Sequence, residues 1–294
     1  MTALTPDRLD DALAALDGDP ALTVLAGGTD LMVAVNYGQR RPEAVLSLRR
    51  LTELRGWAVE PGPGGDEVVL GAATTYTGLL RPELAGLVPA LAQAARTVGS
   101  PQIRNTGTVG GNLATGSPAG DTLPVLAAHG ARVELASAHG RRTLAVDEFL
   151  LGPKRTALRP GELLTAVRVP LASGPAEFLK IGVRNAMVIA VANCALVVDR
   201  PRRTVRCALG SVGPVPVRDP AAEAWLADEV DWDGGTPPPA GVAEEFGRRL
   251  AAACRPIDDH RATADYRRHA VGVMARRAVA RAWPPGPTAR GRAA

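Results

Sequence analysis

Apolar and polar residues follow two rhythms along this chain, one with the spacing of helices and one with that of strands. Apolar residues recur every three or four positions, as on one face of a helix, in five segments: residues 7–16, 83–98, 221–226, 242–253 and 262–283. Short apolar runs bounded by Gly, Pro or charged residues predict strands at residues 23–26, 44–48, 68–72, 132–135, 163–169, 176–181, 188–198 and 205–212. A short helix from Leu31, an apolar helix after Asp121 and a hairpin through residues 138–140 complete the prediction.

Three segments have the composition of connections rather than of packed elements. Residues 171–175, Leu-Ala-Ser-Gly-Pro, predict the main domain boundary. The Pro- and Gly-rich residues 60–65 predict a turn or a subdomain boundary. Residues 284–294, rich in Pro, Gly and Arg, are expected to be disordered.

A first pair of glycines, Gly27 and Gly28, lies between a predicted strand and a predicted helix. The local order is Leu25-Ala26-Gly27-Gly28-Thr29-Asp30-Leu31. It places free backbone N–H groups at a helix N-terminus, an arrangement that favours an anion such as a phosphate. A plain N-cap at Thr29 or Asp30 is the alternative, and the two roles are compatible.

A second pair, Gly110 and Gly111, lies in a polar stretch that runs from Ile103 to Asp121. Adjacent glycines let the backbone approach a ligand and turn its N–H groups toward it. Neutral hydrogen-bonding side chains surround the pair: Thr108, Asn112 and Ser117. An ordinary surface turn is the alternative interpretation. Neither pair has the spacing of a dinucleotide fingerprint or a P-loop, but two such loops could bind the two phosphates of a pyrophosphate from opposite sides.

These motifs resemble the FAD-binding medium subunit of molybdenum hydroxylases, the family of xanthine dehydrogenase, carbon monoxide dehydrogenase and aldehyde oxidase flavoproteins. The resemblance rests on the two glycine loops, with Ser117-Pro118 and Asp121-Thr122-Leu123-Pro124 after the second. It continues over most of the chain, in residues 159–167, Lys180, residues 184–186, 213–218, 266–268 and 276–278. The two glycine loops together are a specific signal, whereas the C-terminal pieces alone are weak.

The resemblance implies an α+β architecture. A two-part FAD-binding domain of the PCMH (vanillyl-alcohol-oxidase-like) type would occupy residues 1–172, with subdomains of about 1–57 and 58–172. A C-terminal domain with an antiparallel sheet and helices, similar to that of carbon monoxide dehydrogenase flavoproteins, would occupy residues 176–283.

The resemblance also implies a set of FAD contacts. The glycine loops would hold the pyrophosphate, and Asp121 would accept hydrogen bonds from the adenosine ribose; on the residues alone, Asp121 could equally be a helix N-cap. Lys180, one of two lysines in the chain, would lie near the flavin pyrimidine ring, its alternative being an exposed strand lysine. The backbone of Leu164 would meet the isoalloxazine edge, and Arg184, Asn185 and Ile189 would lie near the flavin mouth. The expected FAD-binding residues are Leu25, Ala26, Gly27, Gly28, Thr29, Asp30, Leu31, Val98, Ile103, Thr108, Gly110, Gly111, Asn112, Ser117, Asp121, Leu164 and Lys180.

Two positions depart from the family pattern. Many relatives have an aspartate where Val188 stands, and larger members have a phenylalanine near the flavin where Val98 stands. Loss of an aromatic group there could change the flavin potential or the access of a second substrate, so the electron acceptor stays open.

Composition excludes several other classes of function. The net charge is +4, but the arginines are interleaved with carboxylates and aromatic residues make up only 3% of the chain, which disfavours a nucleic-acid surface. Three separated cysteines and four scattered histidines predict neither an iron–sulfur cluster nor another metal site. The chain has no apolar run of membrane-spanning length and no signal peptide at its start, so a cytoplasmic location is expected.

No nucleophile–base pair or pair of carboxylates stands out, so the expected chemistry is that of the flavin. The main hypothesis is an electron-transfer subunit that receives electrons from [2Fe–2S] clusters and passes them through FAD to NAD+, a quinone or O2. The clusters and the molybdopterin would reside on a small and a large partner subunit, in a heterotrimer or its dimer. A self-contained flavin oxidase and a non-enzymatic nucleotide-binding module are the alternatives.

Overall fold

The computed structural model describes residues 2–284, which form a mixed α+β structure with four sheets. The strands are β1 (Thr2–Leu4), β2 (Thr23–Leu25), β3 (Ala44–Ser47), β4 (Trp57–Gly62), β5 (Gly65–Gly71), β6 (Arg132–Ser137), β7 (Gly140–Ala145), β8 (Leu150–Gly152), β9 (Arg155–Thr156), β10 (Leu163–Pro170), β11 (Ala176–Ile181), β12 (Ala192–Asp199), β13 (Thr204–Gly210) and β14 (Val217–Arg218). The α-helices are α1 (Leu9–Gly18), α2 (Leu31–Asn36), α3 (Tyr76–Leu79), α4 (Pro82–Leu87), α5 (Pro89–Thr97), α6 (Pro101–Thr106), α7 (Val109–Thr115), α8 (Thr122–His129), α9 (Val146–Phe149), α10 (Pro220–Glu229), α11 (Ala240–Ala253) and α12 (Ala264–Ala282). Two 3₁₀ turns, Leu48–Arg50 and Thr52–Leu54, follow β3.

The N-terminal part is a small parallel sheet in the order β1-β3-β2, with α1 packed beside it. Helix α1 buries Leu9, Leu13 and Leu16, which share one face because they are spaced three or four residues apart. These side chains meet Leu46 of β3 and Leu163 of β10 in one core. The small sheet is thereby fixed to the larger sheet that follows it.

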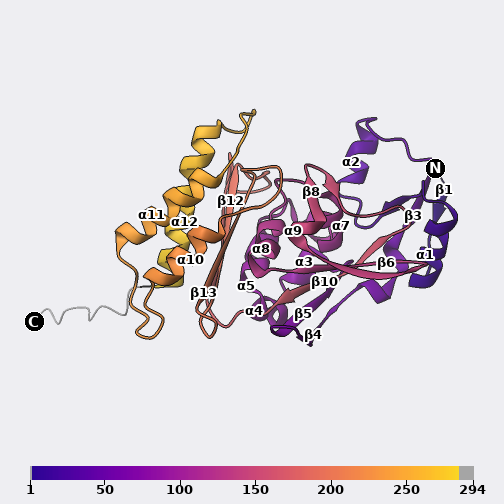
Figure 1. The fold of residues 1–294 in the computed structure, drawn as a ribbon. Helices are drawn as coiled ribbons and strands as arrows, with labels where there is room; N and C mark the ends of the chain where they lie inside the picture. Colours follow the sequence, from indigo (N-terminus) through magenta and orange to yellow (C-terminus); the bar gives the residue numbers. More distant parts are fainter. Residues whose placement is uncertain (1, 285–294) are drawn as a thin grey trace, which may run out of the picture.

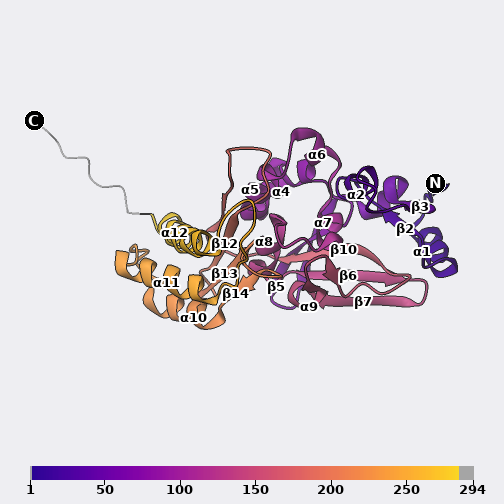
Figure 2. The ribbon, with the colours of Figure 1, turned by 90° about the horizontal axis from the view of Figure 1, so that it is seen from above.

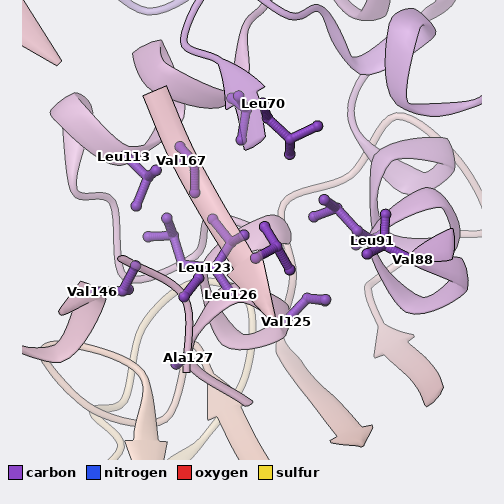
Figure 3. Close-up of a cluster of buried hydrophobic side chains, with 14 of the residues drawn as sticks. Leu70, Val88, Leu91, Leu113, Leu123, Val125, Leu126, Ala127, Val146 and Val167 are labelled. Atoms are coloured by element: carbon purple, nitrogen blue, oxygen red, sulfur yellow. The ribbon is translucent and has the colours of Figure 1, made fainter. Parts of the chain in front are cut away.

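The middle part is a five-stranded antiparallel sheet in the order β4-β5-β10-β6-β7. The largest core of the protein lies between this sheet and helices α5, α7 and α8. Figure 3 shows Val167 of β10 beside Leu113 of α7 and Leu123 of α8. Because aromatic residues are scarce, aliphatic side chains fill most of this core.

The C-terminal part is an antiparallel sheet, β11-β12-β13-β14, buried on both faces. Every residue of β12 is buried, because successive side chains point to opposite faces and both faces are covered. Ala195 and Val197 contact the core shared with the middle part, whereas Cys194 and Leu196 contact α11 and α12. Helices α5 and α8 therefore pack on one face of this sheet, and α10 to α12 cover the other (Figure 1).

Seen from above, the molecule is elongated, with α1 and β1–β3 at one end and α10–α12 at the other (Figure 2). Helices α5 to α8 lie between these ends, and α5 and α8 contact the C-terminal sheet. None of the helices between residues 2 and 284 combines the length and the apolar character needed to cross a membrane.

Most predicted elements form close to their expected bounds, and the exceptions have local causes. The helix predicted over residues 83–98 is two helices, because Pro89 cannot continue a helix and forces Val88 out of helical geometry (φ −132°). Residues 60–65 contain the hairpin turn between β4 and β5, one of the two alternatives predicted for them. The strand predicted from residue 188 begins at Ala192, because the preceding residues form a loop at the cavity described below. The tail predicted to be disordered, except for Pro284, lies outside the described residues.

Candidate functional site

A cavity of about 860 Å³ opens between the N-terminal, middle and C-terminal parts. Its wall combines β2, the following loop and α2 with the α6–α7 region, the start of α8, and the loop between β11 and β12. Of the residues expected to bind FAD, the lining includes Leu25, Ala26, Gly27, Gly28, Thr29, Asp30, Leu31, Val98, Ile103, Thr108, Gly111, Asn112, Ser117, Asp121 and Lys180. Segments far apart in the sequence thus meet around one hollow.

The first glycine loop presents unused hydrogen-bond donors to this cavity. Within the part of the chain that the structure describes, the backbone N–H groups of residues 27–30 donate to no other protein group. Gly28 has φ +73°, a conformation that residues with a side chain rarely adopt. Asp30 occupies the N-cap position of α2 but makes no side-chain capping hydrogen bond. The N–H groups of this loop are therefore free to bind an anion.

Gly27 brings the two predicted loops into direct contact. A Cβ at Gly27 would lie 1.9 Å from the carbonyl oxygen of Thr106, at the end of α6. Only glycine permits this approach, because no side-chain motion could relieve a clash with a backbone atom. The first loop and the α6–α7 junction thus form one continuous wall.

The second glycine pair differs from its prediction. Gly110 and Gly111 lie in the first turn of α7 rather than in a loop, and their N–H groups are already bonded. Gly110 donates to the Ala72 carbonyl (2.9 Å), and Gly111 donates to Oγ1 of Thr108 (3.0 Å), the N-cap of α7. A Cβ at Gly110 would lie 2.6 Å from the Cβ of Ala72, so this glycine serves helix–sheet packing and does not line the cavity.

Asp121 and Lys180, predicted for different parts of the cofactor, form a buried ion pair. Their side chains are 6% and 7% exposed, and Nζ of Lys180 lies 2.5 Å from Oδ2 of Asp121. Thr97 donates to the same carboxylate oxygen (3.1 Å), and Asn193 of β12 donates to the other one (3.2 Å). Lys180 also donates to the Thr97 carbonyl (3.2 Å). Asp121 stands at the N-cap position of α8 without a capping hydrogen bond, so the plain N-cap interpretation is wrong.

Burial dominates the electrostatics of this pair. Desolvation raises the pKa of Asp121, and the Lys180 charge together with the hydrogen bonds from Lys180, Thr97 and Asn193 opposes the rise. Burial also raises the pKa of Tyr76, and the nearby Asp121 charge adds to that effect. The cavity therefore has a tyrosine with a raised pKa close to the buried Asp121–Lys180 pair.

Tyr76 is the main lining residue that the sequence analysis missed. Tyr76 is 5% exposed and is the first residue of the short helix α3. Its ring packs against Gly107, where a Cβ would lie only 2.7 Å from a ring carbon. The one feature of the sequence that could have drawn attention to Tyr76 is the rarity of tyrosine, since the chain has only three. Further lining residues come from α2, its C-terminal loop and the β8–β9 turn: Ala34, Gln39, Arg40 and Lys154.

Other predicted positions lie apart from the cavity or at its edge. Leu164 is buried in β10 opposite Leu135 of β6 and does not line the cavity. Arg184 and Asn185 are outside the lining, while Val188 and Ile189 from the same loop belong to it. Arg184 instead donates to the carbonyls of Ala186 and Met187, which holds the loop in shape.

The residues present fit FAD. A pyrophosphate matches the free N–H groups of the first loop, and a buried ammonium matches a ring system on which negative charge develops. In the described range, no cluster of His, Cys, Asp and Glu has a geometry suited to a metal ion. Cys194 and Cys207 lie in the C-terminal core, with their sulfur atoms 3.6 Å apart.

Comparison with known proteins gives the same family over almost the whole chain. Residues 1–172 match the FAD binding domain in molybdopterin dehydrogenase, and residues 177–282 match the CO dehydrogenase flavoprotein C-terminal domain. The carbon monoxide dehydrogenase medium chain of Hydrogenophaga pseudoflava is 33% identical, with 88% of each chain covered. The glyceraldehyde dehydrogenase medium chain of Sulfolobus acidocaldarius is 31% identical, with 92% of this chain and 94% of the relative covered.

A solved structure of the carbon monoxide dehydrogenase from Hydrogenophaga pseudoflava, in a form lacking the Mo-pyranopterin moiety of its cofactor, superimposes with a TM-score of 0.86. The match is 32% identical and covers 96% of this chain and 97% of the other. The expected two-domain fold and the FAD cofactor are thereby confirmed. The chain belongs to the FAD-binding medium subunits of the molybdenum hydroxylase family of oxidoreductases.

Proposed function

We propose that this subunit receives electrons from [2Fe–2S] clusters on a small partner subunit and passes them through FAD to NAD+, a quinone or O2. A large partner subunit would carry molybdopterin and oxidise the substrate. The assembly would be a heterotrimer or its dimer. One observation carries this proposal: the cavity joins free N–H donors at one side to a buried Lys180–Asp121 pair at another.

The range of relatives supports a role in electron transfer rather than in substrate binding. Medium chains named for carbon monoxide and for glyceraldehyde align with this chain over about nine-tenths of its length. One chain of constant length and fold is poorly suited to recognise both a diatomic gas and a sugar aldehyde. A shared electron-transfer task explains the common structure better, with each substrate bound elsewhere in its complex.

The chain's own residues would bind and orient the cofactor. The N–H groups of Gly27 to Asp30 would bind its phosphates, and Asp121 together with Lys180 would fix its position deeper in the cavity. When bound, FAD supplies the redox chemistry. Lys180, 7% exposed and paired with Asp121, would place an N–H donor and a positive partial charge close to the ring.

Gly28 allows a direct test of phosphate binding by the first glycine loop, with Gly38 as a matched control. Gly28 and Gly38 have nearly the same positive φ, +73° and +70°, so alanine imposes similar backbone strain at both. Gly28 lines the cavity, whereas Gly38 does not and has open space around its Cβ position. We expect Gly28→Ala to weaken FAD binding by roughly tenfold or more, since relief of the strain turns the donor N–H groups away, and Gly38→Ala to leave it unchanged.

The direction of electron flow needs a separate experiment. The FAD-loaded chain would be reduced anaerobically with dithionite and mixed in turn with NAD+, a soluble quinone and O2, while flavin absorbance near 450 nm is followed. Rapid reoxidation by one acceptor, together with copurification of iron-containing chains from the native host, supports the proposal. Turnover of an organic substrate by the isolated chain would instead support a self-contained flavin oxidase.

A further inference from the structure

The C-terminal domain contains a buried arginine that the cofactor site does not use directly. Arg267, near the start of α12, is 1% exposed. Its guanidinium binds Asp259 (Nη2 to Oδ1, 2.6 Å) and donates through Nη1 to the carbonyls of Val191 (2.6 Å) and Ser211 (3.0 Å). A buried charge is costly unless it is paired and hydrogen-bonded, so such an arginine is held in place by several partners at once.

A second arginine shares the same carboxylate and reaches the same loop. Arg261 contacts Oδ2 of Asp259 through Nε (3.0 Å) and Nη2 (2.6 Å). Its Nη1 donates to the carbonyl of Ala190 (2.8 Å). Asp259 thus fixes two guanidiniums that bind consecutive carbonyls, those of Ala190 and Val191. Those two residues immediately follow Val188 and Ile189, which line the FAD cavity.

Arg267 is also connected, through Ser211, to a second wall of the cavity. Ser211 has φ +63°, an unfavourable conformation for a residue with a side chain. In this conformation its carbonyl accepts from Arg267, and its N–H donates to the carbonyl of Pro118 (2.9 Å). Pro118 lies between Ser117 and Ala119, both of which line the cavity. Arg267 is therefore two hydrogen bonds away from the segment that leads to Asp121.

We propose that Arg267 and Arg261, held by Asp259, are positioning residues for FAD: they fix the β11–β12 loop on one wall of the cavity and, through Ser211, the Ser117–Asp121 segment on another. The proposal rests on FAD occupying this cavity. It gives the Tyr266-Arg267-Arg268 motif a function within the chain. Neither arginine touches the cavity itself.

The test uses Arg267→Met, Arg261→Met and the matched control Arg268→Met in the full chain. Arg268 is the next residue on α12 and is 41% exposed; among residues 2–284, the side chain with which it forms an ion pair is the exposed Asp265 of its own helix. Trypsin cleavage after Arg184 reports on the freedom of the β11–β12 loop without any need for FAD. Each variant is assayed well below its own unfolding temperature, so that only the folded state is compared.

We expect cleavage after Arg184 to become roughly tenfold faster in Arg261→Met and Arg267→Met, because local opening of the loop becomes easier. FAD should bind about five- to tenfold more weakly, with a shifted fine structure in the 450 nm band. Arg268→Met should match the unmodified chain in all three measurements. If the unmodified chain takes up no FAD, the cofactor assignment fails, while the cleavage rates still test the positioning role.

A purely structural role for these arginines gives a different result. The unfolding temperature would then fall, while cleavage after Arg184, FAD affinity and the flavin spectrum of the folded variants stayed unchanged, and the proposal would be overturned. Should Arg267→Met fail to fold, Arg261→Met decides the question. That side chain is 19% exposed, and its loss removes the bond to Ala190 while leaving Arg267 paired with Asp259.

Discussion

Buried titratable groups give individual residues of this protein a measurable effect on stability. His129, at the end of α8, is 5% exposed and its Nδ1 lies 3.0 Å from the carbonyl oxygen of Pro170. Burial lowers the pKa of His129 to about 4, with a contribution from the Arg206 charge and opposed by the bond to Pro170. The folded protein therefore keeps this imidazole neutral under conditions in which the unfolded chain would protonate it.

His129 predicts a loss of stability in mild acid. Its folded-state pKa lies below the unfolded value of 6.5, so its contribution is fully present above pH 6.5 and is lost as the pH falls toward 4. The loss over this window should be about 3 kcal/mol in the free energy of unfolding. Urea denaturation at several pH values, compared with His129→Gln, would measure it.

The glutamine variant should be less stable at neutral pH but show a flatter dependence between pH 4 and 6.5, because it has no imidazole to protonate. Equal slopes for the unmodified chain and His129→Gln would contradict the assignment of this effect to His129.

At the scale of elements, the short helices around the cavity are stabilised by caps and tertiary bonds more than by their own length. Helices α6 and α7 have six and seven residues, too few to be stable alone. Ser100 caps α6, and Thr108 caps α7 by accepting from Gly111. The N–H of Gly110 also bonds α7 to the Ala72 carbonyl, directly after β5.

Thr108→Ala should lower the free energy of unfolding by about 1 kcal/mol, because the N–H of Gly111 loses its capping oxygen. Guanidinium denaturation would measure the change. Thr106→Ala is the matched control: its hydroxyl donates back to Gln102 within α6, and its side chain is exposed. The capping account fails if both alanine variants lose the same amount.

At the scale of the whole molecule, the contacts between the two domains include an apolar core, a buried ion pair and hydrogen bonds such as that from the Ser211 N–H to the Pro118 carbonyl. The apolar contacts join α5 and α8 to one face of the C-terminal sheet. The pair joins Asp121, before α8, to Lys180 on β11, and Asn193 on β12 completes the carboxylate's partners. Domain contact and cofactor site therefore share the same residues.

Lys180→Met should destabilise the chain by about 3 kcal/mol or more at neutral pH, because Asp121 would remain buried without its cation. The double variant Asp121→Asn/Lys180→Met should recover much of that loss, since no unpaired charge remains. A double-mutant cycle measured by chemical denaturation gives the coupling free energy. Additive losses from the two single substitutions would show that the pair contributes no net coupling.

The amino-acid sequence by itself determined many of the longer helices and strands and their order, because periodicity depends on residues close together in the chain; the short helices α3, α6 and α7 were not predicted. The spacing of Leu9, Leu13 and Leu16 predicts α1, and the apolar run over residues 188–198 predicts the strand β12. The glycine loops also predicted most of the cavity wall, since close backbone approach requires glycine wherever it occurs. The prediction that the cofactor is FAD came from the family resemblance.

Only the tertiary structure decided how these pieces act on one another. It joined Asp121 to Lys180, fifty-nine residues apart, and turned the N–H groups of Gly110 and Gly111 inward to protein acceptors. It also brought Arg267 to the loop beside the cavity. Hydrogen bonds and ion pairs between distant segments leave no periodic pattern in a sequence, because their partners are set by packing in three dimensions.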